Sequence, residues 1–392
     1  MRILLVTETL IVGGAETFVV RLANWLADKH EITLAVMHGE LVQPELKARL
    51  SARVRYEALV LPGKKWLFKI DSALRKAKLD LSPLYWLQRR WLTNVVGRLK
   101  PDIVHSHLLK ADRLASMICQ GTSCRHVITL HGDYRPYIES QADPHFLKLT
   151  ERLHGVVDQA AALVGVCSEH LEFVAKIAPQ ARPRLHMIYN GYSALASKDA
   201  DSDNTLALPA GFLFGMVSRG VEKKGWQEAI DAFVSLGAAN AWLVLVGSGP
   251  YLDHLAAGPL PSNVILAGFS ADPVKYIRHF DVCLLPTLFP YESLPTVVIE
   301  YLACAKPVVA TDVGEIAVML ADGSGGSAGR LLAFDGENIS HEQLVGEMRR
   351  LFEDASLRHQ LSQSAVAAFA KFDMTRCGEA YLSVYRDAVA ES

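Results

Sequence analysis

Glu292 and Glu300 are two carboxylates, separated by seven residues, that flank the start of a predicted helix. Pro295 is tolerated only in the first turn of a helix, so Glu292 should lie on the preceding loop and Glu300 on the second turn. The unpaired backbone amides of Thr296 and Val297 and the positive end of the helix dipole favour an anion there. The spacing predicts a phosphate between two carboxylates that accept hydrogen bonds from sugar hydroxyls. A capped surface helix is the alternative.

Arg219 and Lys224 are two cations that follow a predicted strand at residues 212–217. The end of such a strand lies at the carboxyl edge of a parallel sheet, where ligands of doubly wound folds bind. Two fixed cations there can stabilise a departing diphosphate through charge-assisted hydrogen bonds, without a metal ion. The alternative is that Lys224 forms an ordinary exposed basic pair with Lys223.

Two glycine pairs also follow predicted strands: Gly13 with Gly14, and Gly247 with Gly249. Glycines in tight turns let the backbone approach a ligand closely, although turn geometry alone explains each pair taken singly. Neither pair belongs to a GxGxxG fingerprint, so the sequence gives no direct support for a dinucleotide cofactor.

Three histidines stand at predicted strand ends: His105, His107 and His131. A strand end that faces ligand favours a polar role, and His131 with Gly132 is placed to meet a substrate hydroxyl or a pyrophosphate. Metal binding is the alternative, because alternate residues such as His105 and His107 share a strand face. No carboxylate or cysteine completes a convincing set of ligands, so we expect no metal.

Residues 62–100 form a basic arm that contains ten Lys and Arg against two Asp. Tryptophans, tyrosine and phenylalanine alternate with these charges, a mixture typical of segments that lie on an anionic membrane surface. The alternative is a helix packed on the sheet by one apolar stripe. We expect both, with the Lys-rich part facing solvent or lipid and the stripe in the core; no nucleic acid is expected, since no recognised reading module accompanies the charge. The predicted stripe consists of Leu84, Leu87, Trp91, Val95 and Leu99.

Two parallel sheets must position these residues, because short apolar runs alternate with amphipathic segments in both halves of the chain. A length of 392 residues suits two domains. We expect a doubly wound α/β fold with one Rossmann-like domain at 1–195, a linker at 196–210 and a second such domain at 211–374. A final helix at 375–389 is expected to cross back, so that 375–392 return to the first domain. The predicted strands are 2–6, 31–37, 103–107, 126–130, 162–167 and 185–189, then 212–217, 241–246, 263–267, 282–286 and 307–311.

The linker at 196–210 is polar and acidic. Asp199, Asp201 and Asp203 imitate a calcium loop or a DxD motif, but Asn204 stands where a calcium loop requires glycine. A solvated linker is therefore the better interpretation.

The overall composition is that of a globular protein, with 50% hydrophobic and 21% charged residues, which excludes disordered and collagen-like classes. The formal net charge of −2 conceals a basic first half and an acidic second half. The six cysteines contain no CxxC pair and suit reduced core positions of a cytosolic protein. There is no run of 18 apolar residues, and a signal peptide is not expected.

The order and spacing of these motifs resemble the retaining glycosyltransferases of family 4, which have the GT-B fold of two Rossmann-like domains facing across a cleft. The resemblance covers nearly the whole chain. Its motifs are Gly13-Gly14, 101–107, His131-Gly132, 189–191, 218–225, 246–250, Gly268-Phe269, 292–300 and 306–309.

The resemblance assigns roles to individual residues. It implies that Arg219 and Lys224 clamp the diphosphate, that Glu300 binds the ribose and that Glu292 contacts the transferred sugar. His131 would lie beside the donor sugar at the reaction centre. Donor-binding residues are thus expected at Gly13, Gly14, Arg219, Lys224, Gly247, Phe269, Glu292, Leu294, Thr296, Val297 and Glu300; catalytic residues at His131, Arg219, Lys224 and Glu292; and acceptor-binding residues at Gly14 and His107.

Three positions depart from the family pattern: Ser293-Leu294 for Gly-Phe, Tyr301 for Ala and Ala305 for Gly. We expect them to affect the identity of the sugar more than the activity.

The resemblance implies transfer of a hexose-type sugar, with retention, from a UDP- or GDP-sugar to a hydroxyl of a glycan or lipid-linked acceptor, without metal or cofactor. The process would be bacterial cell-surface polysaccharide or glycolipid synthesis, in the cytoplasm or peripherally on the inner face of the cell membrane. The alternatives are a nucleotide-sugar 2-epimerase and a nonenzymatic binding subunit of an envelope complex. The missing fingerprint disfavours an NAD-dependent oxidoreductase.

Overall fold

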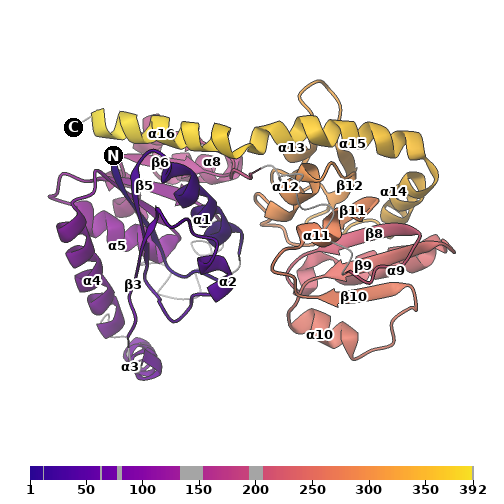
Figure 1. Cartoon of the computed structure of the whole chain (residues 1–392), viewed down its shortest axis with the longest axis horizontal. Helices are drawn as coiled ribbons and strands as arrows, with labels where there is room; N and C mark the ends of the chain where they lie inside the picture. Colours follow the sequence, from indigo (N-terminus) through magenta and orange to yellow (C-terminus); the bar gives the residue numbers. More distant parts are fainter. Residues whose placement is uncertain (12, 62–63, 77–81, 133–152, 194–205, 391–392) are drawn as a thin grey trace. The chain divides into compact units, whose positions relative to one another are not determined.

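The chain divides into two compact units in a computed structural model (Figure 1). The first consists of Met1–Gly191 with Met374–Ser392, and the second of Tyr192–Asp373. The structure describes residues 1–11, 13–61, 64–76, 82–132, 153–193 and 206–390. Most of the predicted linker, including Asp199, Asp201 and Asp203, lies outside these residues. Each unit is described by itself.

The first unit is built on a parallel sheet with the strand order β3-β2-β1-β4-β5-β6-β7. Its central strands are almost wholly buried, which explains why they read as apolar runs rather than as alternating patterns. The strands are β1 (Arg2–Thr7), β2 (Glu31–Val36), β3 (Arg55–Ala58), β4 (Ile103–His107), β5 (Arg125–Leu130), β6 (Ala162–Gly165) and β7 (Leu185–Met187). The helices are α1 (Gly14–Leu26), α2 (Pro44–Lys47), α3 (Lys64–Lys76), α4 (Pro83–Leu99), α5 (Leu109–Cys119), α8 (Ser168–Ile177) and α16 (Met374–Ala390).

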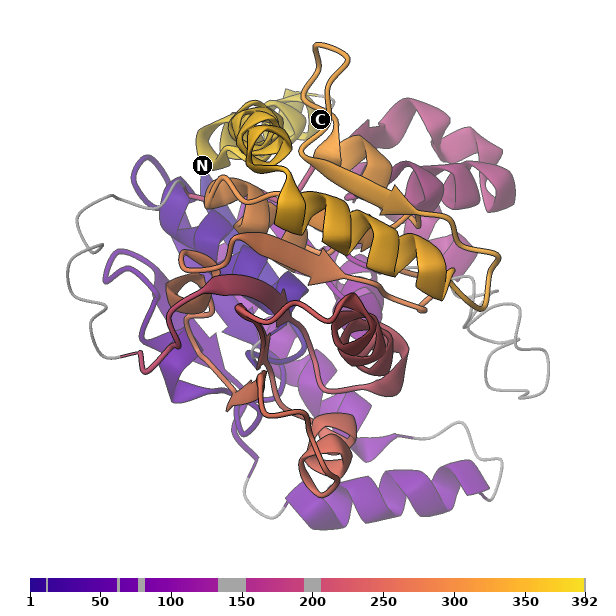
Figure 2. The ribbon, with the colours of Figure 1, turned by 90° about the vertical axis from the view of Figure 1, so that its right-hand side faces the viewer.

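The second unit, which faces the viewer in Figure 2, repeats this plan. Its parallel strand order is β10-β9-β8-β11-β12-β13. The doubly wound α/β prediction is therefore confirmed. The strands are β8 (Phe212–Val217), β9 (Ala241–Val246), β10 (Val264–Gly268), β11 (Val282–Leu285), β12 (Val308–Thr311) and β13 (Gly329–Leu332). The helices are α9 (Trp226–Leu236), α10 (Pro250–Ala256), α11 (Val274–Ile277), α12 (Thr296–Ala303), α13 (Ile316–Leu320), α14 (His341–Glu353) and α15 (Ala355–Phe369).

Two strands, β3 and β13, were not predicted because both are four-residue edge strands that contain charged residues. β3 has the sequence RYEA and no fully buried residue. β13 begins at a glycine, and its Arg330 forms an ion pair with Glu347 at 2.8 Å. A polar edge strand lacks the apolar run by which a buried parallel strand is recognised.

The predicted stripe of α4 is partly wrong. Leu84 and Val95 are buried as predicted, and the partly buried Trp91 and Leu99 pack against the core, but Leu87 is only partly buried. The face that packs on the sheet is rotated toward the set Leu84, Gln88, Leu92, Val95 and Val96. Because Gln88 is polar, the sequence did not predict that this face is buried. Its Nε2 lies 3.2 Å from His38 Nε2, so the polar group is satisfied in the interior.

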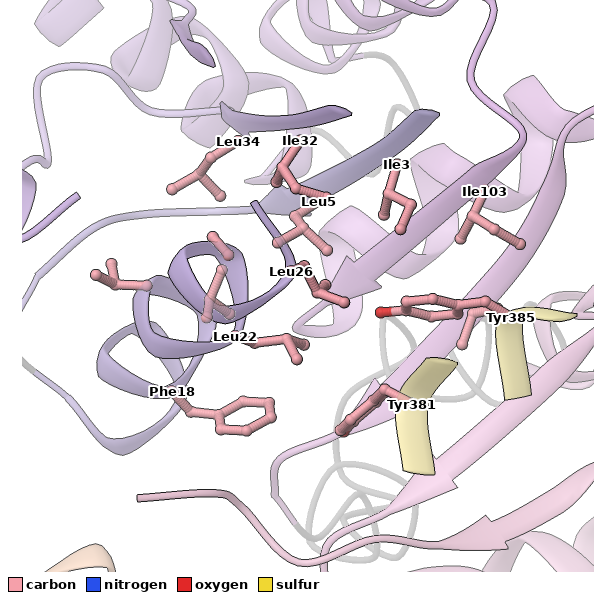
Figure 3. Packing of buried hydrophobic residues seen from close by; sticks show 14 of the residues in the cluster. Ile3, Leu5, Phe18, Leu22, Leu26, Ile32, Leu34, Ile103, Tyr381 and Tyr385 are labelled. Atoms are coloured by element: carbon pink, nitrogen blue, oxygen red, sulfur yellow. The ribbon is translucent and has the colours of Figure 1, made fainter. Parts of the chain in front are cut away.

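The final helix, α16, packs on the first unit and completes its core. Tyr381 and Tyr385 are fully buried and point among the apolar side chains of α1 and the strands (Figure 3). Gly378 allows this close approach, because a Cβ there would overlap the ring of Trp25 on α1. Gly191, the last residue of the first segment, likewise faces α16, where its Cβ would lie 2.7 Å from Cys377 Cβ.

We predict that Gly378→Ala destabilises the first unit by about 1–3 kcal/mol, because the added methyl group overpacks the contact between α16 and Trp25. Gly97 in α4 is the matched control, since a Cβ there meets no atom within 4 Å. Gly97→Ala should instead stabilise the protein by about 0.5–1 kcal/mol through helix propensity. Chemical denaturation measures both; equal effects of the two substitutions would contradict the packing argument.

Candidate active site

Lys224 and Glu292, predicted as separate ligand-binding residues, form an ion pair in the second unit. Lys224 ends the short 3₁₀ turn after β8 (Glu222–Lys224), and its Nζ donates to Glu292 Oε2. Their side chains are only 8% and 12% exposed, so each charge depends on the other for compensation. Thr287 Oγ1 also donates to Glu292 Oε2 at 3.2 Å, and Lys224 Nζ lies 5.4 Å from the ring centroid of Phe289.

Glycines bring the loops that carry this pair into backbone contact. Gly225 has φ +81°, and a Cβ there would overlap the carbonyl oxygen of Pro286. Gly314 has φ +58°, and a Cβ there would overlap the carbonyl oxygen of Glu292. Only glycine combines a positive φ with no side chain, so these contacts fix the loops on either side of the ion pair.

Arg219 lies on the same β8 loop with an exposed side chain. Its carbonyl oxygen accepts a hydrogen bond from Trp226 Nε1 at 3.1 Å, which anchors the loop to α9. The next residue, Gly220, donates its N–H to Ser248 O at 2.8 Å, and its Cβ would lie 2.6 Å from Gly249 N. The predicted cation loop and the predicted glycine turn after β9 are therefore in direct backbone contact.

The glycine turn after β9 also contacts the loop that carries Phe269. Gly247 N donates to Gly268 O at 2.9 Å, so the loop after β9 lies beside the loop after β10. Phe269 follows β10 and is 56% exposed. An exposed aromatic ring at the carboxyl edge of a sheet offers a flat apolar surface to a ligand.

Helix α12 begins one residue later than the sequence suggested. Pro295 is the N-cap, not a residue of the first turn, and the helix starts at Thr296. Thr296 and Val297 are partly exposed at this end, Glu300 lies on the second turn, and Leu294 is buried beneath the loop. The predicted order of carboxylate, helix start and second carboxylate is present.

Tyr301, which departs from the family pattern, lies inside the second unit and does not reach its surface. Its hydroxyl accepts from Val217 N at 2.9 Å and donates to Leu284 O at 3.2 Å. These backbone groups belong to β8 and β11, whose pairing ends at Leu284 and Met216. The hydroxyl thus replaces the next hydrogen bond between the two strands, and it links α12 to the carboxyl ends of both.

Ala305, another departure, adopts φ +55°, a left-handed conformation that favours the expected glycine. Ser362 Oγ donates to its carbonyl oxygen at 2.7 Å and holds this turn. Tyr301 is fully buried, so its side chain is not available to contact a ligand.

In the first unit, His107 and His131 lie together at the carboxyl edge of the sheet. His107 Nδ1 is 2.9 Å from His131 Nε2. His131 is partly exposed, but His107 is fully buried. A fully buried imidazole does not meet an acceptor hydroxyl, so the expected acceptor-binding role of His107 does not fit this structure.

His105 completes this histidine cluster. His105 Nδ1 lies 2.7 Å from Tyr385 Oη, and its Nε2 lies 2.7 Å from Thr129 Oγ1. Burial lowers the pKa of His131 to about 3 and holds those of His105 and His107 well below the usual value, so all three rings are neutral at pH 7. Within the described ranges no group of three His, Cys, Asp or Glu side chains could hold a metal ion.

Gly13 and Gly14 lie at the same edge as the histidine cluster, at the start of α1. Gly13 is the N-cap and Gly14 the first residue of that helix. Glu16 folds back under Gly13 and accepts from Thr9 Oγ1 at 2.8 Å. Phe18 of α1 lies 5.6 Å from His131 between ring centroids, which brings this glycine turn and His131 to one region.

Sequence reasoning missed Thr287, Phe289 and the packing role of Tyr385. Thr287 and Phe289 had a signal, because they follow a predicted strand and precede Glu292. Tyr385 had none, since its partner His105 is 280 residues away.

Among the described helices, none is both long and apolar enough to cross a membrane. The six cysteines all lie in described parts of the chain and form no disulfide.

Family models match both units. The model described as "Glycosyltransferase Family 4" matches residues 12–194, and "Glycosyl transferases group 1" matches residues 211–354. The D-inositol 3-phosphate glycosyltransferase of Acidothermus cellulolyticus is 36% identical over 315 residues, which cover 74% of this chain and 68% of that protein. A Bacillus subtilis protein named for teichuronic acid biosynthesis, TuaC, is 27% identical over 59% of this chain, which spans 60% of its length.

Solved structures show a likeness over nearly the full length. Anabaena Alr3699/HepE in complex with UDP has a TM-score of 0.73 at 19% identity, covering 98% of this chain and 99% of that one. The sucrose-phosphate synthase of Thermosynechococcus elongatus has a TM-score of 0.75 at 16% identity and covers 100% of both chains. At these identities the likeness concerns the fold, and it confirms the expected GT-B fold.

We predict that Tyr301→Phe lowers the free energy of unfolding by about 1–3 kcal/mol, because it leaves the buried N–H of Val217 and carbonyl of Leu284 without their partner. Denaturation of the full chain measures this loss. Tyr291→Phe is the control, since that tyrosine is 38% exposed and should tolerate the change. Equal stability of the two variants would contradict the tie between α12 and the strands.

Proposed function

The chain belongs to glycosyltransferase family 4, and we propose that it transfers a hexose-type sugar from a UDP- or GDP-sugar to a hydroxyl of a glycan or lipid-linked acceptor. We propose retention of configuration and no requirement for a metal ion. The observation that carries this proposal is the Lys224–Glu292 ion pair in front of α12, with Glu300 one turn further along that helix.

The proposed donor site follows from the charges of the second unit. The diphosphate would bind Arg219, Lys224 and the amides that begin α12, while Glu292 and Glu300 accept hydrogen bonds from sugar and ribose hydroxyls. An ammonium has three donors, so Lys224 can keep its bond to Glu292 while it donates to a phosphate oxygen. Glu292 is thereby held in place before the donor arrives. The exposed ring of Phe269 would support the base.

In the proposed mechanism the bond between the anomeric carbon and the diphosphate breaks as the acceptor hydroxyl attacks from the same face. Arg219, Lys224 and the helix start stabilise the charge of the leaving diphosphate, and the leaving phosphate takes the proton of the attacking hydroxyl. The protein would contribute mainly positioning and electrostatic stabilisation.

UDP-glucose is the first donor to test. Anabaena Alr3699/HepE, which shares the fold, was solved with UDP and with UDP-glucose. The purified chain should be incubated with a panel of UDP- and GDP-sugars, with melting temperature and released nucleotide as readouts. The bound donor should raise the melting temperature, because it binds only the folded state. Release of free nucleotide dependent on acceptor supports transfer, whereas interconversion of the donor without release would identify an epimerase.

Variants of the ion pair test the site directly. We predict that Lys224→Met and Glu292→Gln each lower kcat by about 10²–10³-fold, because each removes electrostatic stabilisation of the transition state. Each should also cost about 3–5 kcal/mol of stability, since a buried charge is left unpaired. The double variant should recover stability but not turnover. Lys223→Met, on the exposed neighbouring lysine, is the control, and normal turnover in Lys224→Met would overturn the assignment.

An anionic membrane surface is the proposed setting, with the acceptor presented there in bacterial surface polysaccharide or glycolipid synthesis. Within the basic arm, Trp66 on α3 and Trp86 on α4 are 63% and 56% exposed. Arg90 is exposed and its Cζ lies 5.6 Å from the ring centroid of Trp86. Exposed tryptophan beside arginine suits an interface of lipid headgroups. Residues 62–63 and 77–81 of the arm lie outside the described residues.

We predict that the protein sediments with vesicles containing phosphatidylglycerol but not with purely zwitterionic vesicles, and that salt weakens the binding. Trp66→Ser with Trp86→Ser should reduce the bound fraction strongly. Val366→Ser is the control, because Val366 on α15 is 62% exposed but lies outside the basic arm. Equal binding by the tryptophan variant and the control would remove the arm from the proposal.

A further inference from the structure

His107 is the last residue of β4, and His131 comes directly after the neighbouring strand β5. His107 pairs in register with Thr129 on β5, so His131 lies two residues beyond that partner, just past the end of β5. The two rings are joined from His107 Nδ1 to His131 Nε2 at 2.9 Å. His107 is fully buried behind the partly exposed His131. Nδ1 is therefore the nitrogen of His131 that this bond leaves available to a ligand.

The proton positions of this pair follow from what surrounds it. Both rings are neutral at pH 7, because burial lowers their pKa values, so one nitrogen donates and the other accepts. If His131 donated, the proton of His107 would lie on its Nε2. That nitrogen is buried and has no hydrogen-bond partner among the described side chains and backbone. A buried N–H without an acceptor is rare, so the favoured arrangement has His107 Nδ1–H donating to His131 Nε2.

The ring of His107 is held in place from behind. His105 packs against it with ring centroids 4.1 Å apart and the ring planes tilted by 45°, and His105 is itself bonded on both nitrogens, to Tyr385 and Thr129. Tyr385 comes from α16 (Figure 3), and its hydroxyl lies 2.7 Å from His105 Nδ1. Phe18 covers another side of His107, with ring centroids 6.4 Å apart. A ring packed in this way has little freedom to rotate and release His131.

We propose that His107 is a positioning residue, which holds His131 in the tautomer with its proton on Nδ1, so that His131 meets its ligand as a hydrogen-bond donor. This inference rests on the proposed function, in which His131 lies at the reaction centre. As a donor from Nδ1, with Nε2 already occupied, His131 has no lone pair to take the proton of the acceptor hydroxyl. It would instead contact an oxygen of the transferred sugar or of the acceptor.

Nitrogen-15 NMR of histidine-labelled protein tests the tautomer without any substrate. In the wild type, His131 should show a protonated Nδ1 and an unprotonated Nε2, with the signals assigned from a His131→Asn variant. His107→Phe removes the donor and should give a mixture of tautomers. His107→Asn places an amide N–H near the former Nδ1 and should retain the wild-type pattern. A proton on Nε2 in the wild type, or an unchanged pattern in His107→Phe, would overturn the inference.

Turnover tests whether the tautomer matters. His107→Phe should lower kcat by about 10- to 100-fold, as expected when a group at the reaction centre is misplaced. The KM for the donor should change less than kcat, because the groups proposed to bind its diphosphate and ribose lie in the second unit. His107→Asn should recover most of the loss. Unchanged kcat in a folded His107→Phe variant would reject the positioning role.

His126 provides a control for the effect of losing a buried histidine. It lies on β5, is 2% exposed and bonds through Nε2 to Ser106 Oγ at 2.8 Å. Ser106 points to the opposite face of the sheet from His105 and His107, so His126 does not belong to the cluster. His126→Phe should lower the melting temperature yet leave kcat and the His131 spectrum unchanged. A loss of kcat equal to that of His107→Phe would assign both effects to stability.

The two kinds of readout separate this inference from the proposed function. If the panel of donors gave no transfer while His107→Phe still changed the His131 tautomer, the proposed function would fail and the tautomer assignment would stand. If transfer occurred and the tautomer did not respond, only the inference would fail.

Discussion

The ion pair between Lys224 and Glu292 is the interaction on which the second unit's site depends. Two nearly buried charges of opposite sign are stable only while they remain together. The loops that carry them can meet because Gly225 and Gly314 allow backbone atoms to touch where any side chain would overlap. The pair in turn holds Glu292 beside the start of α12. The arrangement of the proposed donor site therefore rests on contacts within the protein itself.

The strands and the ends at which polar residues gather could be predicted, because both signals are local. An apolar run marks a buried strand, and Pro295 placed Glu292 and Glu300 on either side of a helix start. The direct pairing of Lys224 with Glu292 could not be predicted, since the two are 68 residues apart. The edge strand β3 was missed for a different reason: its residues are polar and only partly buried.

Buried polar residues are the least predictable part of the structure. His107 reads as a ligand-binding residue because it ends a strand, yet it is fully buried behind His131. From the sequence, Tyr301 was expected to affect the identity of the sugar, yet its hydroxyl bridges the backbones of two strands by hydrogen bonds. In both cases the chain position is right and the direction of the side chain decides the role. That direction depends on partners distant in sequence, which residue patterns do not contain.

The two units place polar groups at the same edge of similar sheets but compensate them in different ways. In the second unit, charge is kept and paired, as suits a site for an anionic ligand. In the first, burial keeps the histidines neutral, and hydrogen bonds to Tyr385 and Thr129 satisfy both nitrogens of His105. Neutral rings avoid the cost of burying a charge. Each neutral ring can, however, carry its proton on either nitrogen, and its surroundings must determine which. A cluster of neutral histidines can therefore be rigid and still depend on the position of one proton.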